Sequence, residues 1–314
     1  KNVLQKFPKP DWAVQWVPHG CNESTYFPIT PLHNQAPEFE KWANAFKSHH
    51  DVDYVMFWNN RNIRRKQPAD LILAFKVFCD KLPKEKADKC ILVMKTQTRD
   101  DNGTDLVAVK KALCPDYKVY IHDQNIEPKL MNFFYNLADV TVNIASNEGF
   151  GISWCESLHT STPIINNVTG GLQDGCRFED ENGDWIEFNT DFPTNHAGTY
   201  KKHGIWAKPV FPSNRSVQGS PMTPYIFDDR VDFNDVADAM HYWYDMSPEQ
   251  RQEAGQSGYE WVIGNESNMS ARRMGERFIE CIEGCFDNWK PRKRFTLFNT
   301  NEIDMNINKV GVII

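Results

Sequence analysis

From residue 53 onward, short apolar runs alternate with segments in which apolar residues recur three and four positions apart. The short runs are rich in Val, Ile and aromatic residues, which is typical of buried strands, and the spaced segments are typical of helices with one apolar face. The predicted strands are 53–58, 90–94, 117–121, 140–145 and 163–166, and the predicted helices between them are 69–82, 104–113, 127–137 and 152–159. This alternation predicts an α/β fold with a Rossmann-like parallel sheet flanked by helices.

The rhythm stops in the segment 172–232, which is rich in Gly, Pro, Asn and Asp. So long a stretch without structure is unusual inside a domain, so we expect an irregular insertion with short strands and a functional or interface loop. The chain then becomes helical, with helices predicted at 235–246 capped by Asn234, at 248–263 opened by Pro248, and from Ser267 or Asn268 to Trp289.

These patterns divide the chain into three parts. Residues 1–35 contain no complete βα unit and are interpreted as a connector. Residues 36–290 form one sheet domain, and 291–314 form a tail that ends in the strand-like run Val310 to Ile314. An apolar edge strand tends to recruit a partner, so the connector or this terminal run is expected to be exposed or to contact another copy of the chain.

Composition narrows the possible functions. With 40% hydrophobic and 25% charged residues in 314, the chain can bury a substantial core. The net charge of −7 argues against nucleic acid as the main partner, and no apolar run approaches the roughly 18 residues that span a bilayer. The eight cysteines show no Cys-x-x-Cys pair or compact Cys/His spacing, so we expect a reduced, cytoplasmic protein without a metal site.

The segment 147–156, Asn-Glu-Gly-Phe-Gly-Ile-Ser-Trp-Cys-Glu, carries the clearest chemistry. A strand leads through a glycine-containing turn into a helix, which places free backbone amides and the positive end of a helix dipole at the carboxyl edge of the sheet. That edge suits a phosphate, and Gly149 and Gly151 let the backbone approach it. Glu148 and Glu156 lie on either side, where carboxylates can hold hydroxyl groups of a sugar and a ribose.

Two further strand-ending loops are expected at the same edge. The loop after the first strand carries Arg61, Arg64, Arg65 and Lys66, and the loop after the strand 163–166 supplies Thr169, Gly170 and Gly171. Open α/β sheets bind ligands where such loops converge.

These motifs together resemble the nucleotide-sugar-dependent glycosyltransferases of GT-B architecture, specifically the retaining family four (group 1). That family carries two glutamates eight positions apart around Gly-Phe-Gly, matched by Glu148 and Glu156, and an Arg followed five residues later by a Lys, matched by Arg61 and Lys66. Its proline-to-Gly-Gly loop is matched by the segment 163–171, and Pro18-His19-Gly20 resembles its interdomain connector. Asn60 and Gln67 stand where the family usually has glycine. The resemblance covers roughly residues 14–285.

The resemblance implies a role for each matched residue. Arg61 and Lys66 would neutralise the donor diphosphate, and Glu148 would hold the transferred sugar together with the backbone of Gly149, Phe150, Gly151 and Ile152. Glu156 would bind the ribose, and Thr169 and Gly170 would complete the donor site. Arg64 and Arg65 are interpreted as an exposed basic face. No metal and no cofactor besides the nucleotide-sugar substrate is implied.

Three functions remain open at this point. The favoured one is the donor-binding domain of a retaining, metal-independent glycosyltransferase, in the cytoplasm or at a membrane surface. The N-terminal acceptor-binding domain of the family has no counterpart before Lys1, so we expect this chain alone to be inactive. The alternatives are a nucleotide-sugar epimerase or phosphorylase of the same architecture, and a non-catalytic nucleotide-binding interaction module.

Overall fold

A six-stranded parallel sheet forms the centre of the molecule, with the strand order β3-β2-β1-β4-β5-β6. The computed structural model describes residues 11–186, 192–221 and 223–291. The strands of the sheet are β1 (Tyr54–Asn59), β2 (Cys90–Lys95), β3 (Lys118–His122), β4 (Val140–Asn143), β5 (Ile164–Asn167) and β6 (Ala207–Val210). The predicted α/β Rossmann-like sheet is confirmed. The sixth strand was missed because its four residues, with lysine and proline in the middle, show no apolar run.

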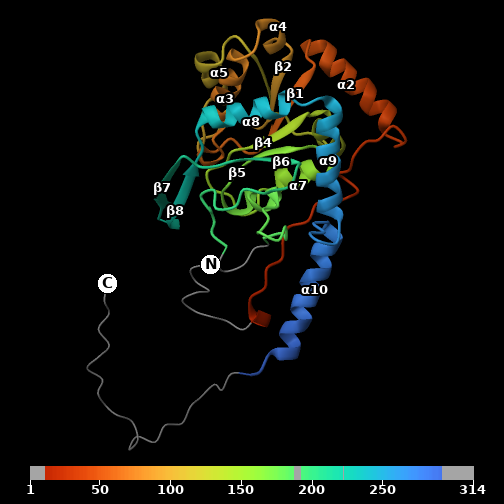
Figure 1. Cartoon of the computed structure of the whole chain (residues 1–314), viewed down its shortest axis with the longest axis vertical. Coiled ribbons are helices and arrows are strands. Elements are labelled where there is room, and N and C mark those ends of the chain that lie inside the picture. Colours follow the sequence, from red (N-terminus) through yellow and green to blue (C-terminus); the bar gives the residue numbers. More distant parts are fainter. Residues whose placement is uncertain (1–10, 187–191, 222, 292–314) are drawn as a thin grey trace, which may run out of the picture.

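Helices cover both faces of the sheet (Figure 1). They are α2 (Ala36–His50), α3 (Pro68–Asp80), α4 (Lys84–Ala87), α5 (Leu106–Leu113), α6 (Pro128–Leu137), α7 (Ile152–His159), α8 (Phe233–Tyr244), α9 (Pro248–Ile263) and α10 (Ala271–Asn288). Because neighbouring side chains of a strand point to opposite faces, each central strand contributes to two cores.

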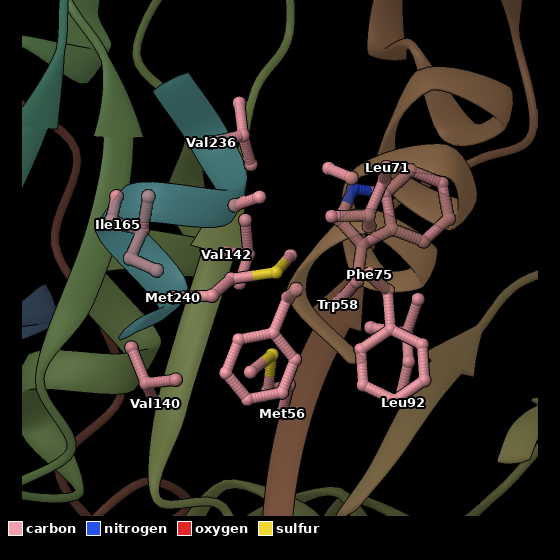
Figure 2. Close-up of a cluster of buried hydrophobic side chains, with 14 of the residues drawn as sticks. Met56, Trp58, Leu71, Phe75, Leu92, Val140, Val142, Ile165, Val236 and Met240 are labelled. Carbon is pink, nitrogen blue, oxygen red and sulfur yellow. The ribbon is translucent and has the colours of Figure 1, made fainter. Parts of the chain in front are cut away.

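The first core lies between the sheet and helices α3 and α8. Figure 2 shows Met56 and Trp58 of β1 facing Leu71 and Phe75 of α3, with Met240 of α8 in the same cluster. All five side chains are buried, and α3 and α8 also pack against each other. This layer fixes β1, and therefore the loop that follows it.

The opposite core is built from the alternate residues of the same strand. Val55 and Phe57 pack against Phe134 and Tyr135 of α6, and helix α2 covers them from outside. Trp42 of α2 meets the ring of Phe134 edge-on, with their centroids 5.1 Å apart. The sequence did not predict α2, although this helix has aromatic residues on the face that meets α6.

The segment 172–232 contains three short strands, where short strands were expected without exact positions. β6 joins the sheet, and β7 (Asn214–Ser220) pairs antiparallel with β8 (Thr223–Arg230) in a separate hairpin. The hairpin is tied to the loop after β4, because the Asp229 amide donates to the Ser146 carbonyl at 2.8 Å and Asn147 donates to the Phe227 carbonyl at 3.2 Å. The insertion thus reaches the edge at which the sequence places the ligand.

Two of the three predicted C-terminal helices begin at a different residue. Helix α8 is capped by Asp232, not Asn234, and α10 begins after Ser270, not at Ser267 or Asn268. The side chains of Asp232 and Ser270 accept hydrogen bonds from free backbone amides at the start of these helices. Helix α9 begins at Pro248 as predicted, behind a capping box formed by Ser247 and Gln250.

Helix α10 extends away from the sheet with the connector beside it (Figure 1). Its apolar side chains Phe278, Ile282 and Phe286 are exposed, and so are Trp289, which caps the helix, and Val14 of the connector. None of the helices described is long and apolar enough to cross a membrane. The predicted terminal strand, Val310 to Ile314, lies outside the described residues.

Candidate functional site

Three strand-ending loops meet at the carboxyl edge of the sheet. The Ser146 amide, after β4, donates to the Arg65 carbonyl of the loop after β1 at 2.8 Å. The Gly171 amide, after β5, donates to the Glu148 carbonyl at 3.1 Å. These two hydrogen bonds join the three loops into one surface, which is the convergence that the sequence predicts.

Glu148 forms ion pairs with two cations of the loop after β1. One oxygen of its carboxylate accepts from the Lys66 ammonium at 2.7 Å and also from the Arg65 guanidinium. Arg65 also donates to the Asn147 carbonyl at 2.7 Å. Burial lowers the pKa of Lys66, and the neighbouring Glu148 carboxylate opposes that shift by stabilising the charged form. Two positive charges therefore lie beside one carboxylate at the start of α7.

Arg61 does not belong to this group. Its guanidinium makes two hydrogen bonds to Asp100, at 2.7 and 3.3 Å, and its side chain is 62% exposed. The structure thus brings Lys66 and Arg65 to Glu148, whereas Arg61 of the same loop pairs with Asp100. Asp100 lies on the loop after β2, so the Arg61 side chain is directed toward that loop.

Glycines allow the backbones at this edge to approach closely. Gly151 precedes α7 with a φ of 85°, and Gly170 has a φ of 50°. A Cβ at Gly170 would lie 2.1 Å from the Glu148 carbonyl oxygen, and one at Gly171 would lie 2.4 Å from the Gly149 carbonyl oxygen. Nothing lies within 4 Å of a Cβ at Gly149, which leaves open space in front of that residue. The paired glycines of the loop after β5 therefore support the turn that carries Glu148.

A cavity of about 500 Å³ opens beside this turn. Glu148, Gly149 and Phe150 line it on one side, and Gly170 and Gly171 line it on another. Its remaining walls are Trp16, Val17, Pro18 and His19 of the connector, together with Gln173, Asp174, Phe192, Pro193 and Thr194. The volume falls in the range of small-ligand sites, which is about 300–1,000 Å³. Three further predicted residues are sequence neighbours of this lining. Gly151 and Ile152 follow Phe150, and Thr169 precedes Gly170.

Glu156 lies deeper than Glu148. Its carboxylate accepts from the Tyr135 hydroxyl at 2.5 Å and from the Asn59 amide at 3.3 Å. Burial raises the pKa of Glu156, and hydrogen bonds from Tyr135, Tyr26 and Asn59 oppose the shift. Glu156 is only 8% exposed, so in this conformation its carboxylate is held mainly by protein donors.

The Thr169 side chain is directed toward the hairpin. Its hydroxyl donates to the Asp229 carboxylate at 2.9 Å, and Asn195 donates to the other oxygen of that carboxylate at 3.1 Å. Thr169 therefore anchors the insertion, and only its backbone adjoins the Gly170 turn. Ile152, the first residue of α7, is 42% exposed.

Sequence reasoning missed three contributors to this site. Arg65 was assigned to an exposed face, because the sequence does not show that the short 3-10 helix Arg64–Lys66 turns its guanidinium toward Glu148. His19 was interpreted as a connector residue, yet its ring contacts Phe150 edge-on at 5.2 Å. Phe192 lies in the irregular insertion, where no pattern marks it.

The chain shares its fold with solved glycosyltransferase structures. Sucrose-phosphate synthase from Thermosynechococcus elongatus superposes with a TM-score of 0.57 at 15% identity over 92% of this chain and 56% of that one. A glycosyltransferase from Rickettsia africae gives 0.61 at 15% identity, over 92% and 61% of the two chains. HepE from Anabaena, solved with UDP and glucose, gives 0.56 at 12% identity, over 84% and 55%.

These likenesses concern the fold, since every identity lies below 25%. No family model matches the chain, and no curated protein matches it by sequence. The chain spans little more than half the length of the sucrose-phosphate synthase and about three fifths of the Rickettsia protein.

Proposed function

We propose that this chain is the donor-binding domain of a retaining, metal-independent glycosyltransferase that transfers a sugar from a nucleoside-diphosphate sugar. The observation that carries the proposal is the cavity beside the Glu148 turn, with Lys66 and Arg65 paired to the Glu148 carboxylate. The motifs of the sequence and the fold shared with glycosyltransferases support the same function.

The ion pairs suggest how the site changes when a donor binds. Glu148 pairs with both Lys66 and Arg65, so its single negative charge balances only one of the two positive charges. A diphosphate at the start of α7 would take over both cations, because phosphate oxygens accept strong charge-assisted hydrogen bonds. The released carboxylate would then accept hydrogen bonds from hydroxyl groups of the transferred sugar. The same cations and the amides of α7 would stabilise the negative charge of the departing diphosphate, which requires no metal ion.

The chain is proposed to act together with a second, acceptor-binding domain. The solved neighbours are longer than this chain, and several apolar residues of α10 and Val14 of the connector are exposed. A two-domain transferase excludes water and completes its site only when both domains close. We therefore expect this chain alone to bind nucleotide weakly and to transfer essentially no sugar. Efficient transfer by the chain alone to any acceptor would contradict this part of the proposal.

The two glutamates provide the test of the proposed function. UDP and UDP-glucose are suitable probes, because Anabaena HepE has been solved with UDP-glucose. Glu148→Gln is expected to weaken UDP-glucose binding about tenfold or more and to change UDP binding much less, since only the intact donor carries the sugar. Glu156→Gln is expected to weaken both ligands to a similar degree, because it disturbs the Tyr135 and Asn59 network behind the site.

Isothermal titration of both ligands into both variants measures the difference. Circular dichroism and thermal melting of each variant control for unfolding. Identical responses of the two ligands to Glu148→Gln would remove this residue from the sugar position, and with it the main support for sugar transfer at this site.

A further inference from the structure

Two cysteines and a histidine from distant parts of the chain meet at helix α7. The sulfur atoms of Cys21 and Cys155 and one ring nitrogen of His159 all lie within 4.8 Å of one another. All three residues are buried: Cys155 and His159 are fully enclosed, and Cys21 is 3% exposed. They lie in the apolar surroundings of Trp154, Leu158 and Trp261, away from the ion pairs of Glu148.

One nitrogen of the His159 ring is left without a partner. Its Nδ1 lies 2.8 Å from the Cys155 carbonyl oxygen, so Nδ1 carries the proton and donates it to that oxygen. Nε2 then holds a free lone pair, and it is buried without any hydrogen-bond partner among the described residues. Metal-binding histidines commonly fix their tautomer by donating from one nitrogen and coordinating through the other. An unpartnered buried acceptor costs about 1–3 kcal/mol, which a bound cation would remove.

The backbone holds the two thiols in place. Cys155 and His159 lie one turn apart on α7, so their side chains share a face. Cys21 is fixed from the connector, because its amide donates to the Met269 carbonyl at 2.9 Å and its carbonyl accepts from Ala271 at 2.7 Å. The Cys21 sulfur lies within 4.8 Å of the Cys155 sulfur and of a His159 ring nitrogen. The three ligand atoms therefore converge from two separately anchored segments.

We propose that Cys21, Cys155 and His159 form a binding site for one Zn²⁺ ion. Two thiolates and one imidazole are a ligand set that Zn²⁺ prefers, with Zn–S near 2.3 Å and Zn–N near 2.0–2.1 Å. Such bonds place neighbouring ligand atoms of a tetrahedron about 3.5–3.8 Å apart. The two sulfur atoms and a His159 ring nitrogen lie within 4.8 Å of one another, so the separations need to shorten by at most about 1.3 Å. On binding, both thiols release their protons to solvent.

A bound ion would link the connector, through Cys21, to helix α7, which follows the Glu148 turn of the candidate donor site. Helix α7 begins at the Gly151 turn and carries Glu156, next to Cys155. The sequence led us to expect no metal site. Cys21 is remote in sequence from the other two residues, and Cys155-x-x-x-His159 alone is a weak signal. It does not depend on sugar transfer, and the ion takes no part in the proposed reaction.

Cobalt substitution tests the site directly. The chain is stripped with a chelator, kept reduced, and titrated with Co²⁺, whose thiolate charge-transfer absorption reports sulfur ligands; Zn²⁺ is then added in competition. We expect the band to saturate at one equivalent and to disappear when Zn²⁺ replaces Co²⁺. Zn²⁺ should also raise the melting temperature of the stripped chain.

Variants assign the ligands. Cys21→Ser and Cys155→Ser should each reduce the band by about half, and His159→Gln should weaken Co²⁺ affinity at least about tenfold. Cys176→Ser is the matched control, since Cys176 is an equally buried free cysteine outside the cluster. No charge-transfer band in the reduced, folded wild-type chain would overturn the proposal. A band that persists when Cys21 and Cys155 are both serine, or a Cys21–Cys155 disulfide that forms under the same reducing conditions, would also overturn it.

Discussion

Replacing Lys66 by methionine is expected to weaken nucleoside-diphosphate binding by about 1–3 kcal/mol, or about 5- to 150-fold. Methionine keeps the buried aliphatic stem and removes the charge that lies 2.7 Å from Glu148. Arg65→Met is expected to have a smaller effect of the same kind, because the Arg65 guanidinium is more exposed. Isothermal titration with UDP, repeated at higher salt, measures both losses.

Arg61→Met is the matched control for charge in the same loop. Arg61 is paired with Asp100 at the surface. The fold loss of UDP affinity for Arg61→Met should therefore be less than half of the fold loss for Lys66→Met. Equal losses for Lys66, Arg65 and Arg61 would indicate a diffuse basic patch. That result would exclude a diphosphate site centred on Lys66.

Gly170→Ala is expected to have the largest structural effect of any single methyl group in the site. The residue has a φ of 50°, and its new Cβ would lie 2.1 Å from the Glu148 carbonyl oxygen, so the turn carrying Glu148 must move. We expect a loss of stability of about 2 kcal/mol or more and a loss of detectable UDP binding. Thermal unfolding and titration of the same sample measure the two effects.

Gly149→Ala is the control for this prediction. Nothing lies within 4 Å of its added Cβ and its φ is not positive, so thermal stability should remain close to that of the wild type. UDP binding should still weaken, because Gly149 lines the cavity that the ligand is proposed to enter. An unchanged melting temperature for Gly170→Ala would show that the turn tolerates a different geometry from the one described.

The sequence predicts the sheet well because local patterns determine it. The five predicted strands are short segments rich in apolar residues, and the segments between them have helical spacing, so the βα units can be predicted from local patterns. β6 lacks such a pattern and owes its place to pairing with β5, which is a long-range contact. Helix α2 packs through Phe39, Trp42 and Phe46. Its other residues are mostly polar, so the segment does not stand out as apolar in the sequence.

The site was predictable to the level of its loops, because strand ends of a parallel sheet share one edge. Which cation turns toward Glu148 depends on the short 3-10 helix Arg64–Lys66, whose geometry no sequence pattern shows. The outward pairing of Arg61 depends on Asp100, which lies on the loop after β2. The meeting of Cys21 with Cys155 depends on how the connector docks beside α10, and that is set by tertiary structure alone.

Titration of the folded chain with UDP, GDP, ADP and CDP tests the central claim most directly. A nucleoside diphosphate at the Glu148 turn predicts saturable one-to-one binding of at least one of them, which weakens with salt because Lys66 and Arg65 provide the charge. No saturable binding of any of the four to the folded wild-type chain, or binding that Lys66→Met and Gly170→Ala leave unchanged, would contradict the account.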